Sequence, residues 1–436
     1  MTKTILPFKT EKTKELITPN SGLTLYLELY RALKIRENVR DLFPKPGSSK
    51  GFDANVYVLS ILILFLAGGK YIEDIRKIQL DKALKKVGNL SLIPSPDAIG
   101  DWMRNNSLEK MHALKIIHRR LSKRFLKKVM RKTHTLDIDA FEIVSNKDTA
   151  KFTYKFNKGY MPIVGHLAEL DWCVGYEFRE GNDSPNARNL EFLKQCFKNL
   201  PKSHQITRVR IDSAGYQGDI FKFLDKKNVK FTITGVKTTN IIREIELIKS
   251  NDWQPFIDKD GFKTNRVYAE TWATMDGFPG YFRLIIQRWL NPKQDLFNEE
   301  EVFCYHVICT NYSVKDHSAL DVIYWHNGRA NSENYYKEKK QGFNLNYLPC
   351  DNFEANAIWF AIGLMAYNCH VFTKEHFLPN SWRRKTIQTI RWQLIHIAGK
   401  VVKHAGLIWL KFSGVSDEFK FIFDQARQKC ATYAGP

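Results

Sequence analysis

The stretch LDIDAF, residues 136–141, determines how this chain is interpreted. Its apolar residues alternate with Asp137 and Asp139, and such alternation is typical of a half-buried β-strand. Because side chains in a strand alternate between its two faces, we expect both aspartates on the same face. A buried carboxylate is costly unless it is paired, hydrogen-bonded or bound to a metal. The residues themselves leave two alternatives open: an aspartate that caps a turn, or a carboxylate that binds a cation.

The composition indicates a polyanionic partner. The chain has 436 residues with 67 Lys and Arg against 46 Asp and Glu, a formal net charge of +21. This length suggests two or three domains, and this charge favours nucleic acid. The seven cysteines show no Cys-x-x-Cys spacing, which argues against a zinc site or a disulfide framework. The longest apolar run, residues 56–69, is short for a membrane span, so we expect a cytoplasmic protein with no membrane partner.

Hydrophobic periodicity predicts an α/β protein with a mixed sheet flanked by helices. Residues 20–130 show helical spacing, and Ser95 followed by Pro96 is typical of a helix start, compatible with a helix-turn-helix unit. From residue 131 three strand patterns come in a row, and helix and strand patterns then alternate. The predicted regions are a helical DNA-binding region at 1–130, the first part of a core at 131–235, a β-rich insertion at 236–300, the second part of the core at 301–345, and a C-terminal helical region at 346–436.

A run of basic residues precedes the LDIDAF strand. KIIHRRLSKRFLKKVMRK, residues 115–132, contains nine Lys and Arg and no acidic residue. A solvated helix face usually mixes charges of both signs, so this run favours contact with phosphates. The candidates for that contact are Arg120, Arg124 and Lys128. An apolar ridge recurs at every fourth position, at Ile117, Leu121, Phe125 and Val129.

Two further carboxylates complete a candidate site. Asp212 follows the strand pattern QITRVRI, and ligands of open α/β sheets bind at the carboxyl ends of strands, although Asp212 could instead cap the next helix. Glu333 lies in YWHNGRANSENYYKEKKQGF, residues 324–343, where a helical period places it on one stripe with Arg329, Tyr336 and Lys340. An ordinary salt-bridged surface helix has the same spacing.

These carboxylates suit metal-dependent phosphodiester chemistry. Asp139, Asp212 and Glu333 together could hold two Mg²⁺ ions, which prefer carboxylate, water and phosphate oxygens, and Mn²⁺ is expected to substitute. Arg329 would grip a phosphate by a bidentate fork and Lys340 as a point charge.

The motifs resemble those of a known family. The order of LDIDA, RVRIDSAGY and HNGRANSENYYKEKKQGF is similar to that of the DDE transposases of bacterial insertion sequences. KGYMPIVGH and LPCDNFEANAIWFAIGLMAYN resemble stretches of the branch called transposase DDE domain group one. The family carries a Tyr–Arg–Glu–Lys signature with gaps of two, three and six residues. Arg329, Glu333 and Lys340 match it, whereas His326 stands at the tyrosine position. The resemblance spans about residues 20–415.

The resemblance implies an RNase H-like core with a strand-rich insertion between the second Asp and the Glu. It also implies cleavage at transposon ends and strand transfer by a 3′-hydroxyl. The metal ligands would be Asp139, Asp212 and Glu333, with Asp139 favoured over Asp137 as the first. Asp137, His326 and Tyr336 would surround them.

The resemblance further implies partners and a location. The partners would be double-stranded terminal inverted repeats and target DNA, held by a homodimer in the synaptic complex, and the location bacterial and nucleoid-associated. In hairpin-forming relatives an aromatic residue of the insertion stacks on a flipped base. The candidates are Trp253, Trp272 and Trp289, for each of which a structural role is the alternative.

Two other classes of protein stay open. One is a transposase-derived DNA-binding protein without catalysis, although the presence of all three carboxylates argues against this decay. The other is an RNase H-like nuclease, although the length of the chain and its basic helical N-terminal region argue against the smaller nucleases of this fold.

Overall fold

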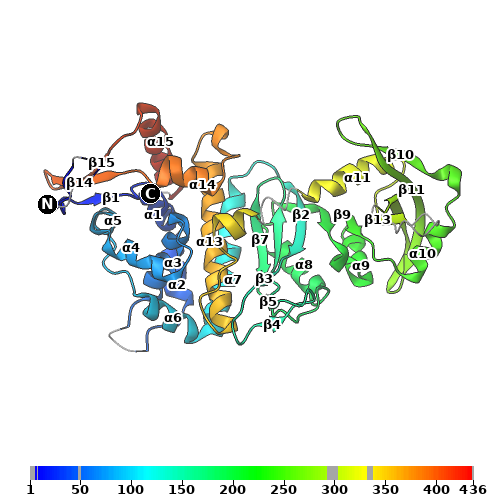
Figure 1. The fold of residues 1–436 in the computed structure, drawn as a ribbon, viewed down its shortest axis with the longest axis horizontal. Coiled ribbons are helices and arrows are strands. Elements are labelled where there is room, and N and C mark those ends of the chain that lie inside the picture. The colour runs from blue at the N-terminus through cyan, green and yellow to red at the C-terminus, as the bar shows by residue number, and fades with distance from the viewer. Residues whose placement is uncertain (1–4, 7, 48–50, 292–302, 331–336, 435–436) are drawn as a thin grey trace. The chain divides into compact units, whose positions relative to one another are not determined.

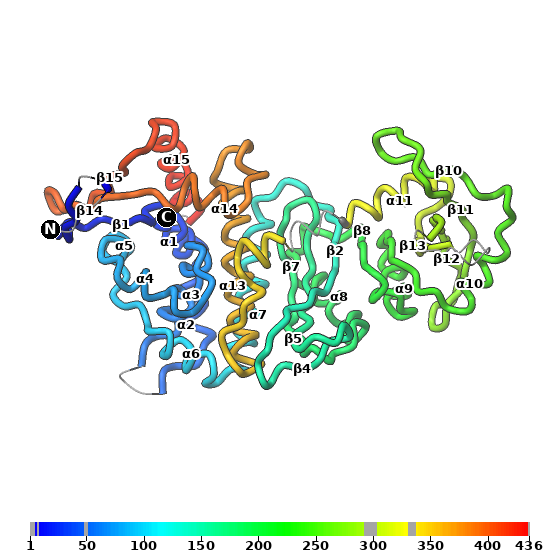
Figure 2. The backbone as a smooth tube through the Cα atoms, in the orientation of Figure 1, coloured from blue at the N-terminus to red at the C-terminus, as the bar shows by residue number. Residues whose placement is uncertain are grey.

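The fold is described from a computed structural model that covers residues 5–6, 8–47, 51–291, 303–330 and 337–434. The chain forms two compact units, Met1–Trp102 with Phe372–Pro436, and Met103–Val371. Figure 1 labels the elements of both units, and Figure 2 traces the backbone through them. Both ends of the chain therefore belong to the same unit.

The first unit is mainly helical. Its helices are α1 (Leu23–Ala32), α2 (Ile35–Leu42), α3 (Ala54–Ala67), α4 (Ile75–Leu80), α5 (Lys82–Val87), α14 (Ile387–Ile390) and α15 (Asp417–Ala434), with α6 (Pro96–Arg104) at its boundary and the short turns η1 (Ile72–Asp74), η6 (Asn380–Trp382) and η7 (Arg391–Ile395). The apolar run at 56–69 forms most of α3, whose residues from Ser60 to Leu66 are all buried. Ser95 caps α6 as predicted, because its Oγ accepts from the Ala98 N–H at 3.2 Å. Within the described residues no single helix has the length and hydropathy of a membrane span, although the bent pair Ala54–Ala67 and Ile72–Leu80 meets these criteria jointly.

The C-terminal region differs from the helical prediction. Residues 399–412 form a hairpin, β14 (Gly399–His404) and β15 (Leu407–Phe412), and β14 also pairs with β1 (Ile17–Thr18). The two residues between the strands, Ala405 and Gly406, have φ values of 47° and 77°. Positive φ at both central positions is what the tightest hairpin turn requires. The apolar residues of GKVVKHAGLIWL fit both a helical and a strand period, so periodicity could not separate the two.

The second unit is built around one mixed sheet. In the described parts of the chain this sheet has nine strands, in the order β10-β11-β12-β13-β9-β8-β2-β6-β7. Their bounds are β2 (Thr133–Ala140), β6 (Ile163–Leu167), β7 (Trp172–Glu177), β8 (Gln205–Ile211), β9 (Lys230–Thr234), β10 (Gln254–Ile257), β11 (Lys263–Met275), β12 (Phe278–Leu290) and β13 (Phe303–Thr310). Strand β8 runs parallel to both β2 and β9, whereas β6 runs antiparallel to β2 and β7. The predicted mixed α/β class is confirmed.

Helices and a small sheet complete this unit. The helices are α7 (Ser107–Lys127), α8 (Asn189–Lys198), α9 (Gly218–Lys226), α10 (Thr239–Glu246), α11 (Ala319–Asn327) and α13 (Phe353–His376), the last of which continues into the first unit. The short turns are η2 (Ser213–Gly215), η3 (Ser250–Asp252), η4 (Gly328–Ala330) and η5 (Glu338–Gly342), and the small sheet contains β3 (Ile143–Val144), β4 (Lys151–Phe152) and β5 (Lys158–Tyr160).

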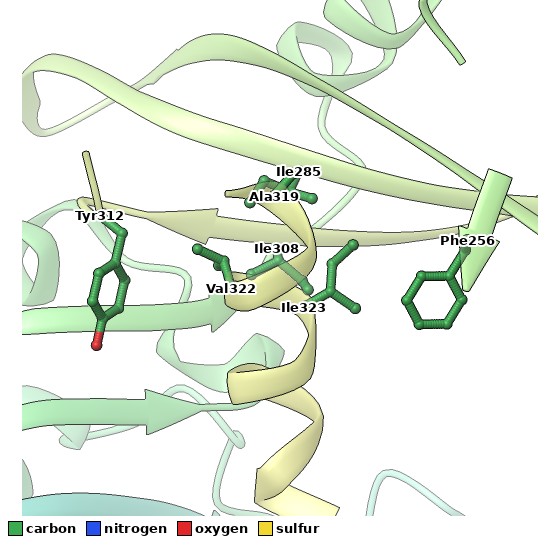
Figure 3. Packing of buried hydrophobic residues seen from close by; sticks show 7 residues of the cluster. All are labelled: Phe256, Ile285, Ile308, Tyr312, Ala319, Val322 and Ile323. Atoms are coloured by element: carbon green, nitrogen blue, oxygen red, sulfur yellow. The ribbon is translucent and has the colours of Figure 1, made fainter. Parts of the chain in front are cut away.

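The β-rich insertion extends the core sheet. Strands β10, β11 and β12 lie within residues 236–300, and β12 pairs with β13 from Arg283↔Thr310 to Leu290↔Phe303. Figure 3 shows the apolar cluster that joins this part of the sheet to α11. Its members are Phe256, Ile285, Ile308, Tyr312, Ala319, Val322 and Ile323. The insertion thus supports the helix that leads to Arg329.

Side chains cover the outer edge of the sheet at β7. The Asn368 side chain on α13 accepts from the Cys173 N–H at 3.2 Å and donates to the Cys173 carbonyl at 2.9 Å. On α7, Phe125 stacks on Trp172 with ring centroids 4.0 Å apart, and Trp172 Nε1 donates to Ser122 Oγ at 3.0 Å. The predicted ridge of α7 is buried here. The Asn368 side chain thus satisfies backbone N–H and C=O groups of the edge strand, which could otherwise pair with a strand of another chain.

Candidate active site

Two short motifs face each other at the carboxyl ends of β2 and β8. The parallel register pairs Asp137 with Arg210 and Ile138 with Ile211. The next position along both strands places Asp139 beside Asp212. Because neighbouring strands are about 4.8 Å apart and side chains alternate, one face carries an Asp–Arg pair followed by an Asp–Asp pair.

In the first pair, the charges of Arg210 and Asp137 neutralise each other. Arg210 Nε donates to Asp137 Oδ1 at 2.6 Å and Nη2 donates to Oδ2 at 2.7 Å, with side chains only 9% and 1% exposed. Arg210 Nη1 also donates to the carbonyl of Trp325 at 2.9 Å, near the end of α11. A Cβ on Gly328 would lie 2.6 Å from Arg210 Nη1, so this glycine allows the helix end to approach closely. Sequence reasoning overlooked Arg210, although RVRID places it two residues before Asp212.

The second pair lacks such a partner on the strands. Burial and the neighbouring charge of Asp212 raise the pKa of Asp139 to about 7, and Arg329 acts in the opposite direction. Burial also raises the pKa of Asp212, again opposed by Arg329. Asp212 Oδ1 accepts from the Ala214 N–H at 3.0 Å, so Asp212 caps η2 and faces Asp139 as well. Two carboxylates held together in this way make this edge of the sheet a candidate site for a cation.

Two basic residues of the predicted signature lie near these carboxylates. Arg329 Nη1 is 3.7 Å from Asp139 Oδ2. Burial lowers the pKa of Lys340, and the charge of Asp139 counteracts this shift. The Lys340 ammonium lies 5.1 Å from the ring centroid of Phe141, just after β2. The structure therefore brings Arg329 and Lys340 to the end of β2 that carries Asp139.

The helix expected around the signature is irregular. Helix α11 ends at Asn327, a 3₁₀ turn covers Gly328–Ala330, and Glu338–Gly342 forms a π-helical turn. The prediction that one regular α-helix aligns Arg329 and Lys340 on the same face is therefore wrong, because 3₁₀ and π-helical turns have other angles per residue than an α-helix. Glu333 and Tyr336 lie outside the described residues. His326 is buried and shares hydrogen bonds with Thr232 Oγ1 at 2.8 Å and Thr234 Oγ1 at 3.2 Å on β9.

The oxygen ligands present suit a hard divalent cation. Asp139 and Asp212 supply carboxylates, which Mg²⁺ prefers over nitrogen or sulfur ligands. Among the described residues no group of three or more His, Cys, Asp or Glu is placed to hold a metal ion. Asp139 and Asp212 are two of the three predicted ligands, and the third, Glu333, lies outside the described residues.

A comparison with protein families matches residues 8–429 to transposase DDE domain group 1. The chain belongs to this family. Among solved structures it is similar to a piggyBac transposase in a synaptic complex with hairpin DNA, with a TM-score of 0.46 and 8% identity over 97% of this chain and 84% of that chain. No curated protein matches it. Membership of the DDE family places the chain among enzymes that cut and join DNA.

The basic residues predicted to contact phosphates in this DDE-family chain lie on α7 or directly after it. Residues 128–132 connect α7 to the first residue of β2, whereas Asp139 is near the end of that strand. At about 3.3 Å per residue, Thr133 and Asp139 are about 20 Å apart. Arg120 and Lys128 are exposed and Arg124 is half-buried. The length of β2 therefore separates Lys128 from Asp139, whereas α7 runs back along β7, where His118 contacts Tyr176 at the level of Asp139.

The three tryptophans of the insertion differ in exposure. The guanidinium of Arg288 lies 3.8 Å from the ring centroid of Trp253, and that of Arg266 lies 4.4 Å from Trp289. Trp272 on β11 is 50% exposed. Of the three, Trp272 therefore presents the most ring surface to a base.

The raised pKa of Asp139 predicts a pH-dependent gain in stability on its removal. A folded-state pKa of about 7, above the usual value of about 3.9, means that the metal-free fold loses stability as the pH rises between the two. Asp139→Asn should therefore raise the free energy of unfolding by about 1–3 kcal/mol more at pH 8 than at pH 5. Urea unfolding in EDTA measures this difference, with the exposed Asp225→Asn as the control. An equal gain at both pH values would contradict the prediction.

Proposed function

We propose that this chain is a DDE transposase that cleaves DNA at transposon ends and joins the freed 3′ end to target DNA with the help of two Mg²⁺ ions, which Mn²⁺ can replace. The observation that carries this proposal is the pairing of Asp139 and Asp212 at the ends of adjacent parallel strands. In the same strand pair Arg210 neutralises Asp137, which favours Asp139 over Asp137 as the proposed metal ligand. Glu333 is proposed as the third ligand.

The sheet topology supports an RNase H-like core. The strands β7, β6 and β2 form an antiparallel set, and β8 and β9 continue the sheet parallel to β2. The acidic residues lie at the carboxyl ends of the central strands, where ligands of such sheets bind. A polypeptide arranged in this way can hold its metal ligands rigidly on strands rather than on loops.

The residues around the carboxylates have distinct roles in the proposed reaction. When bound, the ions lower the pKa of the attacking water or 3′-hydroxyl and stabilise the leaving oxygen. Arg329 and Lys340 hold the phosphodiester at the end of β2, because their positive charges lie beside Asp139. Arg210 is a positioning residue: it links β2 and β8 to the end of α11, one turn before Arg329.

The partners proposed are duplex DNA and a second copy of the chain. The formal charge of +21 favours a polyanion such as the terminal inverted repeats and the target. Joining two transposon ends requires two sites, and a homodimer would supply them. We also propose that the element is a bacterial insertion sequence and that Trp272 stacks on a flipped base if cleavage passes through a hairpin.

A cleavage assay tests the proposed function. A labelled duplex with the element's own end sequence is incubated with the chain and Mg²⁺, then with target plasmid. Cleavage followed by joining to the plasmid supports a transposase. Cleavage without any joining would indicate a nuclease, and specific binding without cleavage a DNA-binding relic; either result overturns the proposal.

A further inference from the structure

A basic groove lies between α7 and α8, on the second unit. Its cavity of about 360 Å³ is lined by His112, Lys115, Ile116, Arg119, Glu191, Lys194, Gln195, Lys198 and Asn199. Four of these residues are Lys or Arg, and Glu191 is the single acidic member. The groove is therefore strongly positive.

The cations of the groove are arranged in a way that opposes folding. Lys115 and Arg119 are four residues apart on α7, and Lys194 and Lys198 are four residues apart on α8. Like charges at this spacing repel each other on a helix. The two pairs also face each other across one groove, which adds to the repulsion.

A single lining carboxylate, Glu191, stands against these four cations. Across the described parts of the chain, no ion pair is formed by Lys115, Arg119, Lys194 or Lys198. Lys194 instead lies 5.9 Å from the ring centroid of Phe223 on α9. The repulsion among these cations raises the free energy of the folded chain when the groove is empty. A polyanion in the groove would offset this repulsion.

Helix α8 begins beside the turn that follows Asp212, but it packs on the sheet face opposite Asp139: a Cβ on Gly165, the partner of Ile138, would lie 2.8 Å from Cys196 Sγ on α8. Asn189, the first residue of α8, donates from Nδ2 to the carbonyl of Ala214 at 2.9 Å, two residues beyond Asp212. From there α8 extends for about 14 Å to Lys198, the length of about four base pairs of duplex. A duplex with its backbone in the groove would thus lie along α8 on this face of the sheet.

We propose that the groove between α7 and α8 binds the phosphodiester backbone of duplex DNA. The contacts are to phosphates and carry no sequence preference, because the lining cations offer charge rather than a pattern of donors and acceptors. This inference rests on the proposed function for the DNA that is bound. It names residues that differ from Arg120, Arg124 and Lys128, the phosphate contacts predicted from sequence.

Salt-dependent binding tests the groove without requiring cleavage. The probe is a labelled random-sequence duplex of about 40 base pairs, a length that exceeds the groove several times. Lys115→Gln with Arg119→Gln, Lys194→Gln with Lys198→Gln, and all four together are compared with the parent in EDTA. Lys222→Gln with Lys226→Gln is the matched control: it removes two charges, four residues apart like each groove pair, from exposed positions on α9 outside the groove.

The groove variants should show a weaker dependence on salt. Each lost phosphate contact reduces the slope of log K against log [salt] by about 0.9, so the double variants lose about 1–2 and the quadruple variant about 3–4. The groove variants should also unfold at the same temperature as the parent or a higher one, because like-charge repulsion is removed. The control should retain the parent slope.

Two outcomes would overturn the inference. One is an unchanged slope in the quadruple variant, and the other is an equal loss in the control, which would show an effect of net charge alone. Mg²⁺-dependent cleavage is measured separately. If the groove variants change the salt slope but the parent cuts no DNA, the inference stands and the proposed function fails. If the parent cuts DNA but the groove variants keep the parent slope, the proposed function stands and the inference fails.

Discussion

Asp139→Asn and Asp212→Asn should each lower the rate of Mg²⁺-dependent DNA cleavage by at least about 10³-fold, because a metal site supplies several kcal/mol of transition-state stabilisation. Asparagine keeps the size of aspartate but removes its charge. At this site the loss is severe, since Asp139 and Asp212 are the described carboxylates that face each other at the strand ends. Single-turnover cleavage of a labelled end duplex measures the effect.

DNA affinity should survive these substitutions. Removing one carboxylate makes the site more positive, so the affinity measured in EDTA should be equal or higher. Asp225→Asn, at an exposed position of α9, is the matched control and should cleave at the parent rate. Cleavage by either active-site variant at the parent rate would exclude that aspartate as a metal ligand.

The second large effect concerns stability rather than catalysis. Arg210→Met should lower the free energy of unfolding by about 3–5 kcal/mol, since it leaves a buried carboxylate without its partner. Asp137 is only 1% exposed, and both its oxygens accept from Arg210. The substitution also removes the hydrogen bond from Arg210 to the Trp325 carbonyl, which ties β8 to α11. Urea unfolding in EDTA measures the loss.

A neighbouring arginine provides the control for this prediction. Arg208 lies two residues earlier on β8, is 38% exposed and is 3.4 Å from Glu169. Exposed ion pairs contribute little, so Arg208→Met should cost less than about 1 kcal/mol. Asp137→Asn combined with Arg210→Met should cost less than Arg210→Met alone, because no charge is then left buried. Equal costs for Arg208→Met and Arg210→Met would refute the role assigned to the buried pair.

Local patterns in the sequence determined much of the fold. The alternation in LDIDAF established a strand with Asp137 and Asp139 on one face, and the ridge of α7 is buried as its spacing indicated. Both predictions rest on the periodicity of side chains within one strand or one helix, and residues close together in the chain determine this periodicity. Periodicity failed in the hairpin of β14 and β15, where the apolar residues fit a helical and a strand period equally. It also failed after Asn327, where the α-helix gives way to a 3₁₀ turn.

Tertiary structure decided which residues share a site. Asp137 and Asp139 are equivalent on their own strand, and only the register of β8, which sets Arg210 against the first and Asp212 beside the second, separates a neutralised carboxylate from a candidate metal ligand. Similarly, the sequence shows that α7 is basic, but packing against α8 selects Lys115 and Arg119 for a groove. The physical reason is that pairing between strands and packing between helices bring together residues far apart in the chain, and the energy of a charge depends on those neighbours.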